Sequence, residues 1–207
     1  MKTTLAAAAA LLSITMSARA HRLDEYLQAT LISVEKDRVE LQVRLTPGVA
    51  VLPIVLASID RDADGVISDS EQRAYAERVL RDFSLTIDGG RLIPKLVAMK
   101  FPAIAEMKEG LGEIQLAFRA DLPRRGPNRR LVFENHHQSQ FAAYLVNCLV
   151  PRDLDIRLVA QTRNDSQAFY QLDYVQTGGR SDSRGVLAGA AALLLFVRLT
   201  SVWRQRS

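Results

Sequence analysis

Apolar and polar positions alternate with a period of two in two neighbouring stretches near the start of the chain. The first covers residues 26–34, the second covers residues 38–45, and residues 35–37 between them have the composition of a turn. Such alternation indicates extended strands that bury one face and expose the other. We therefore expect a β-hairpin, which ends at Pro47 and Gly48.

Between Val49 and Phe83 the hydrophobic period changes from two toward 3.6. Leu52, Leu56 and Ile59 share one helical face before an acidic loop. Four apolar side chains share one face after the loop, namely Tyr75, Val79, Leu80 and Phe83. The pattern predicts a helix, a loop and a second helix. The first helix should be short, because Pro53 is tolerated only in a first turn.

Strand patterns return after the helical pair, with turn residues between them. They cover residues 84–88, 91–100, 113–120, 130–134, 140–150, 155–161 and 169–175. Many short strands at this spacing are typical of an antiparallel β-sandwich. The sequence thus predicts one mainly β domain over residues 21–177, with a helix-loop-helix inserted at residues 49–83.

The first 20 residues have the pattern of a secretory signal peptide. Lys2 precedes an apolar run at residues 5–14, and Ser-Ala-Arg-Ala follows at residues 17–20 as a cleavage site. An uncleaved membrane helix is the alternative, but about ten apolar residues are too few to span a bilayer. We expect export, with His21 as the new N-terminus.

A second apolar segment at residues 185–203 has the length of a transmembrane helix, about 19 residues. Arg198 lies near enough to its end for the guanidinium to reach the membrane surface, and the basic residues 204–207 suit a cytoplasmic tail. We expect a single anchor after a linker at residues 178–184. A short amphipathic or disordered tail and a bacterial C-terminal sorting signal are the alternatives. The domain would then be extracytoplasmic, in the periplasm or at the cell surface.

The positive net charge belongs to the termini. Seven of the 27 basic residues lie outside residues 21–177, against one of the 23 acidic residues, so the domain itself carries a formal charge of −2. A slightly acidic domain lacks the electrostatic footprint that a phosphate backbone requires. We do not expect nucleic acid as a partner.

The acidic loop at residues 60–71 has the spacing of a calcium site. Calcium takes six to eight hard oxygen ligands at about 2.3–2.6 Å. Carboxylates recur at every second position, a glycine permits a sharp turn, and a glutamate closes the loop. The expected ligands are Asp60, Asp62, Asp64, the carbonyl of Val66, Ser68 and a bidentate Glu71. The alternative is an acidic surface loop that caps a helix.

Over these 12 positions the loop resembles the EF-hand family, and its helical flanks fit less specifically. EF-hands usually pair, and the sequence shows no second loop of this kind. A lone extracytoplasmic loop belongs to the weak class, with dissociation constants of about 10⁻⁴ to 10⁻³ M, where ambient calcium keeps it filled. We therefore expect a structural calcium ion rather than a sensor.

The histidines suggest a second metal. After signal cleavage His21 would offer an imidazole and a free amine, the pair that a copper histidine brace uses, and His136 and His137 could add nitrogen ligands. The favoured alternative places His21 in solvent and the histidine pair in a turn between strands. Cys148 is the only cysteine, and its apolar neighbours favour a buried structural thiol over a nucleophile.

A broader resemblance rests on residues 21–28, residues 45–49, the acidic loop and the Glu-Asn-His-His sequence at residues 134–137. These segments are similar to extracytoplasmic domains that precede nickel-permease-like regions of the bacterial hydrogenase and urease accessory family. The resemblance implies a periplasmic accessory domain that handles a transition metal. A multi-helix permease is not in the sequence, so we do not expect this chain alone to transport. We also find no nucleophile elbow, phosphate loop or zinc motif, and expect no enzyme. A copper enzyme that uses a histidine brace at His21 is the less favoured alternative.

Overall fold

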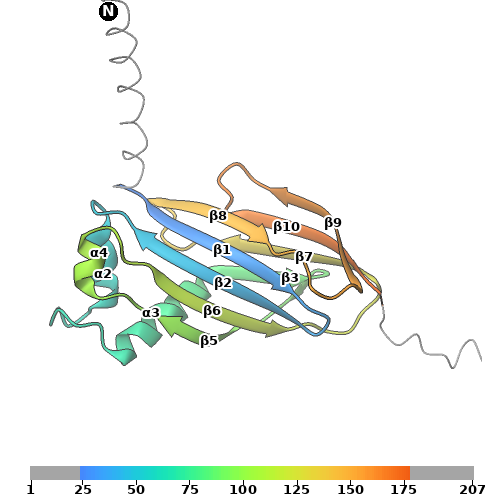
Figure 1. The fold of residues 1–207 in the computed structure, drawn as a ribbon, viewed down its shortest axis with the longest axis horizontal. Coiled ribbons are helices and arrows are strands. Elements are labelled where there is room, and N and C mark those ends of the chain that lie inside the picture. The colour runs from blue at the N-terminus through green and yellow to red at the C-terminus, as the bar shows by residue number, and fades with distance from the viewer. Residues whose placement is uncertain (1–23, 178–207) are drawn as a thin grey trace, which may run out of the picture.

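The chain folds into two β-sheets that enclose one hydrophobic core (Figure 1). The computed structural model describes residues 24–177. The first sheet has the order β5 (Lys95–Lys100), β6 (Ile114–Asp121), β2 (Arg38–Pro47), β1 (Tyr26–Val34) and β8 (Ala142–Cys148). The second has the order β4 (Gly90–Arg91), β3 (Phe83–Ile87), β7 (Asn128–Asn135), β10 (Phe169–Gln176) and β9 (Ile156–Arg163). The mainly β sandwich that the alternating pattern predicts is confirmed.

The predicted all-antiparallel pairing is wrong at one place. β1 and β8 run parallel, with Tyr26 opposite Ala142 and Ile32 opposite Cys148. The chain leaves β7 in the second sheet and enters β8 in the first, so β8 is not joined to its neighbour β1 by a hairpin. Side-chain alternation is the same in parallel and antiparallel strands, and it therefore does not report strand direction.

The core lies between the inward faces of the two sheets. The hairpin of β1 and β2 buries every second residue, as predicted. Two inward positions of β1 are polar, Gln28 and Thr30, and both are buried. They lie between Tyr26 and Ile32 on the same face.

The three helices within residues 24–177 lie at one end of the sandwich (Figure 1). The predicted pair is present as α2 (Leu52–Ile59) and α3 (Asp69–Arg81), and Pro53 is in the first turn of the short α2. A third helix, α4 (Ile104–Lys108), was not predicted, since five residues are too few to show a helical period. The strand expected at residues 91–100 is divided into β4 and β5 on either side of Pro94.

Several sequence predictions concern residues outside those that the structure describes. These are the signal peptide at residues 1–20, the linker at 178–184, the anchor at 185–203 and the tail at 204–207. Within residues 24–177, no helix is long and apolar enough to cross a membrane.

The aromatic side chains between the sheets supply a test of the core. Phe118 of β6 is fully buried, and its ring meets that of Phe83 edge to face at a centroid distance of 5.9 Å. Phe118→Ala should lower the free energy of unfolding by about 3–5 kcal/mol through lost burial and the cavity that remains. Val159→Ala on the outer face of β9, where Val159 is 57% exposed, should change it by less than about 0.5 kcal/mol. Urea denaturation of both variants measures the difference.

Candidate metal centre

The acidic loop connects two helices that hold both of its ends. Asp60 caps the C-terminus of α2, and its backbone N–H donates to the carbonyl of Leu56 at 2.9 Å. Ser68 is the N-cap of α3 and forms a reciprocal capping box with Glu71. Such caps contribute about 1 kcal/mol each to helix stability. The first and last carboxylates of the loop are thus placed by helix ends.

Between these ends the backbone turns back on itself at Gly65. This residue has a φ of 82°, in the left-handed region that favours glycine. Its N–H donates to Oδ2 of Asp60 at 3.1 Å, and the N–H of Val66 donates to Oδ1 of Asp64 at 2.8 Å. The turn thereby brings the middle of the loop back toward its first residue.

Three carboxylates converge in this loop. One oxygen from each of Asp60, Asp62 and Glu71 lies within 4.8 Å of the other two. Among residues 24–177, no other group of three or more histidines, cysteines and acids meets that condition. Oδ1 of Asp60 is buried and has no hydrogen-bond partner in the described part of the chain. A buried carboxylate oxygen without a donor fits a cation ligand, because burial without a partner is costly.

The other expected ligands are Asp64, Val66 and Ser68, and their positions indicate cation binding less directly than the cluster of three does. Asp64 is outside the cluster of three, and its Oδ1 accepts the hydrogen bond from Val66. The side chain of Val66 is exposed, which leaves its backbone as the relevant group. The hydroxyl of Ser68 donates to Oε2 of Glu71 at 2.7 Å, so it lies beside the closing carboxylate.

The loop shifts the pKa values of Glu71 and Asp62 in opposite directions. Hydrogen bonds from the Ser68 hydroxyl and from the backbone of Ser68 and Arg61 lower the pKa of Glu71. At Asp62 a hydrogen bond from the backbone of Asp64 lowers the pKa, but desolvation and the charges of Asp64 and Glu71 outweigh it, and the pKa is raised. Mutual repulsion of carboxylates is what a bound cation would relieve.

A buried polar network fastens α3 to the sandwich, and sequence reasoning did not find it. The hydroxyl of Tyr75 lies 2.6 Å from that of Tyr26 and 3.0 Å from Nε2 of His137. Nδ1 of His137 lies 2.7 Å from Oδ2 of Asp82. Because a carboxylate only accepts, Nδ1–H donates to Asp82, Nε2 accepts from Tyr75, and Tyr26 donates to Tyr75. Polar Gln28 on the inward face of β1 is the signal that could have revealed the network, as its amide donates to the His137 carbonyl at 2.9 Å.

This network bears on the predicted histidine ligands. His137 is 1% exposed and both of its ring nitrogens are hydrogen-bonded, so it is engaged in the core. His136 is exposed and lies 3.0 Å from Glu134. Within the described residues the two imidazoles do not converge on a third ligand of metal-binding type. His21 lies outside the described residues.

The thiol of Cys148 is half-buried at the end of β8. Burial raises its pKa to about 11. A thiol of that pKa is protonated at neutral pH, which favours a structural role over a nucleophilic one.

Neither a protein-family model nor a curated protein matches this chain.

The network predicts a pH dependence of stability. Burial lowers the pKa of His137 below its ordinary value, against the opposing effect of Asp82. The unfolded chain then binds a proton at about pH 6.5, before the folded protein does, so the free energy of unfolding falls as the pH drops below that value. Urea denaturation at pH 7.5, 6.5 and 5.5 measures the slope.

A matched pair of variants isolates the residue. His137→Gln should abolish the slope in this range, whereas His136→Gln should preserve it. An unchanged slope in His137→Gln would assign the titration to another group.

Proposed function

We propose that residues 60–71 bind one calcium ion and that this ion stabilises the domain. The observations that carry the proposal are the convergence of carboxylate oxygens from Asp60, Asp62 and Glu71 and the buried Oδ1 of Asp60, which has no hydrogen-bond donor. All available donors are hard oxygens, which suit calcium better than a softer transition metal.

The spacing of the loop assigns a role to each ligand. The resemblance to EF-hands implies side-chain oxygens from Asp60, Asp62 and Asp64, the carbonyl of Val66, Ser68 directly or through water, and two oxygens of Glu71. Gly65 and its hydrogen bond to Asp60 support this reading, because the turn there is the one that such a loop requires. The bound ion would offset the repulsion that raises the pKa of Asp62.

Binding of this kind would join α2 to α3. The guanidinium of Arg78 in α3 already donates to the carbonyl of Ser58 in α2 at 3.0 Å. Asp60 is the C-cap of α2 and Glu71 lies in the first turn of α3. One ion bound by both carboxylates would therefore link the end of α2 to the start of α3. Since α3 is also fixed to the core through Tyr75, a structural clip is a better fit than a sensor that must open.

The setting that we propose for this site is extracytoplasmic. The signal-peptide pattern at residues 1–20 and the apolar segment at 185–203 support a domain that is exported and anchored by one helix. Millimolar calcium outside the cytoplasm would keep a weak site occupied. The transition-metal alternative has no comparable support within the described residues.

The test is calcium titration of the purified domain, residues 21–177, by calorimetry and thermal unfolding. If the dissociation constant is about 0.1 mM, then about 10 mM calcium should stabilise the fold by about 2.7 kcal/mol through mass action. For a domain of this size the midpoint should rise by roughly 5–10 °C. Glu71→Gln removes the bidentate ligand and should lose most of the heat and of the shift.

Glu77→Gln is the matched control, because Glu77 is exposed on the same helix and outside the loop. It should bind calcium as the original chain does. Absence of both heat and a midpoint shift in the original chain at millimolar calcium would refute the proposal. Equal responses to magnesium and calcium would argue against the seven-coordinate geometry that the loop implies.

A further inference from the structure

The end of the sandwich opposite the helices carries exposed apolar side chains. They lie on the turn between β8 and β9, where Val150 is 84% exposed and Leu154 is 99% exposed. Leu149 beside them is also exposed. Isolated apolar residues are common on surfaces, but these gather on one short turn.

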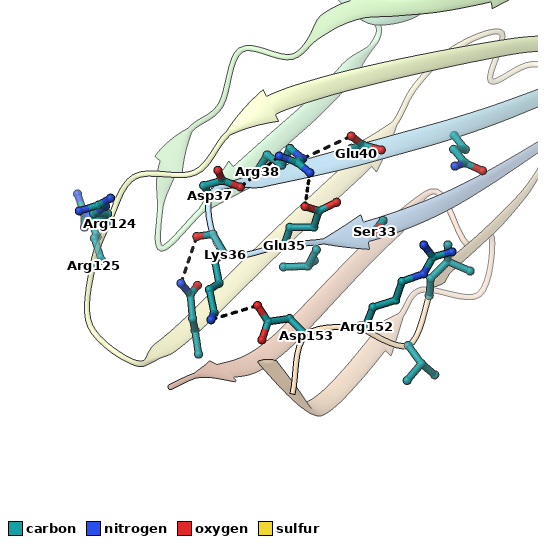
Figure 2. Close-up of a pocket in the computed structure, with 15 residues that line it drawn as sticks. Ser33, Glu35, Lys36, Asp37, Arg38, Glu40, Arg124, Arg125, Arg152 and Asp153 are labelled. Carbon is teal, nitrogen blue, oxygen red and sulfur yellow. Dashed lines mark hydrogen bonds and ion pairs between the residues drawn. The ribbon is translucent and has the colours of Figure 1, made fainter. Parts of the chain in front are cut away.

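Three arginines surround the same end. Figure 2 shows Arg124 and Arg125 on one side of Lys36 and Arg152 on the other. All four line a groove of about 1290 Å³. None of the three forms an ion pair or a side-chain hydrogen bond with any residue between 24 and 177. We call Arg124, Arg125, Leu149, Val150, Arg152 and Leu154 the tip surface.

The acidic residues of this groove are already paired with other cations. Lys36 lies 3.2 Å from Asp153 and 2.5 Å from Asp155. Arg38 forms ion pairs with Glu35, Asp37 and Glu40. Arg119 also pairs with Glu40, so three cations face five carboxylates in these ion pairs. Arg124, Arg125 and Arg152 lie outside the pairs and give this end a small net positive charge, which favours an anionic partner.

The described chain ends beside this surface. The N–H of Thr177 donates to the carbonyl of Asp155 at 2.7 Å, and the side-chain amide of Gln176 donates to the carbonyl of Lys36 at 3.1 Å. The proposed anchor begins at residue 185. Seven extended residues reach about 25 Å at most, so an anchor would hold the neighbouring Leu154 close to the bilayer.

We propose that the tip surface docks on a bilayer of anionic phospholipids. Val150 and Leu154 enter the interfacial region, and Arg124, Arg125 and Arg152 contact lipid phosphates. Apolar side chains flanked by arginines are the combination that binds such an interface, since burial and charge attraction add. The proposal rests on the anchor proposed above for its geometry, and not on calcium.

A fluorophore at the tip tests the docking directly. The full chain carries Leu154→Cys on a Cys148→Ala background and is labelled with an environment-sensitive dye such as NBD. It is mixed with phosphatidylglycerol vesicles or with phosphatidylcholine vesicles, and the emission maximum is recorded. We expect a blue shift with phosphatidylglycerol and a much smaller one with phosphatidylcholine.

Two controls separate docking from general proximity. The same dye at Leu111→Cys, an exposed position just after α4, should show no shift. Combined Arg124→Gln, Arg125→Gln and Arg152→Gln should weaken docking by about a hundredfold, given about fivefold for each basic residue at an anionic surface. The dye at position 154 should then emit as it does in water.

The outcomes also separate docking from anchoring. Carbonate-resistant association with vesicles reports the anchor, whereas the shift at position 154 reports the tip. A shift at 154 in protein that carbonate extracts supports docking and contradicts the anchor. No shift at 154 in phosphatidylglycerol vesicles, an equal shift in phosphatidylcholine, or a shift that survives the triple substitution overturns the docking proposal.

Discussion

The hydroxyl groups of Tyr26 and Tyr75 lie 2.6 Å apart in the core, and this contact joins the sandwich to the inserted helices. Tyr26 begins the first strand, and Tyr75 lies one turn beyond Glu71 in α3. Both hydroxyls are fully desolvated, and burial raises the pKa of each phenol. A buried hydroxyl without a partner costs about 1–3 kcal/mol. The hydroxyl of Tyr26 contacts that of Tyr75, and Tyr75 also bonds His137, so both hydroxyls are paired when α3 lies against the sandwich. The position of the acidic loop therefore depends on a contact made in the core.

The rest of this network determines how β7, β8 and α3 meet. His137 lies where the chain crosses from one sheet to the other, and Asn135 just before it donates to the side chain of Gln28 at 3.0 Å. Asp82, at the end of α3, accepts from the His137 ring. Polar groups that must all be paired permit few arrangements of their elements, whereas an apolar contact tolerates sliding. At this crossing the carbonyl of His137 accepts hydrogen bonds from Gln28 of β1 and Tyr144 of β8, two residues that lie opposite each other in the parallel pair.

The sequence predicts the elements of this fold better than their connections. Period-two alternation located β1, β2 and most later strands, because each strand has one buried face that must be apolar. The 12-residue spacing predicts the acidic loop between the two helices, since each proposed ligand position has a local chemical reason. Neither signal reports the relative direction of two strands or which distant segments pair, so neither predicts the parallel pairing of β1 with β8. Residue type and the neighbouring His136 predict a turn residue or a metal ligand at His137, yet the ring bonds Tyr75 and Asp82, which lie 62 and 55 positions away. The buried Gln28 and Thr30 on β1 and Asn135 on β7 give a local hint that polar partners must exist.

The two proposed sites lie at opposite ends of the sandwich, and this separation has a consequence for calcium. β2 runs from the hairpin beside the tip surface to the start of the helical pair, and its ten residues span about 30 Å. At physiological ionic strength the Debye length is about 8 Å, so the potential of an anionic bilayer is screened over that distance. A docked membrane would therefore neither concentrate calcium at residues 60–71 nor compete with them for it. Occupancy of the loop would follow the bulk calcium concentration, which is what a permanent structural clip requires.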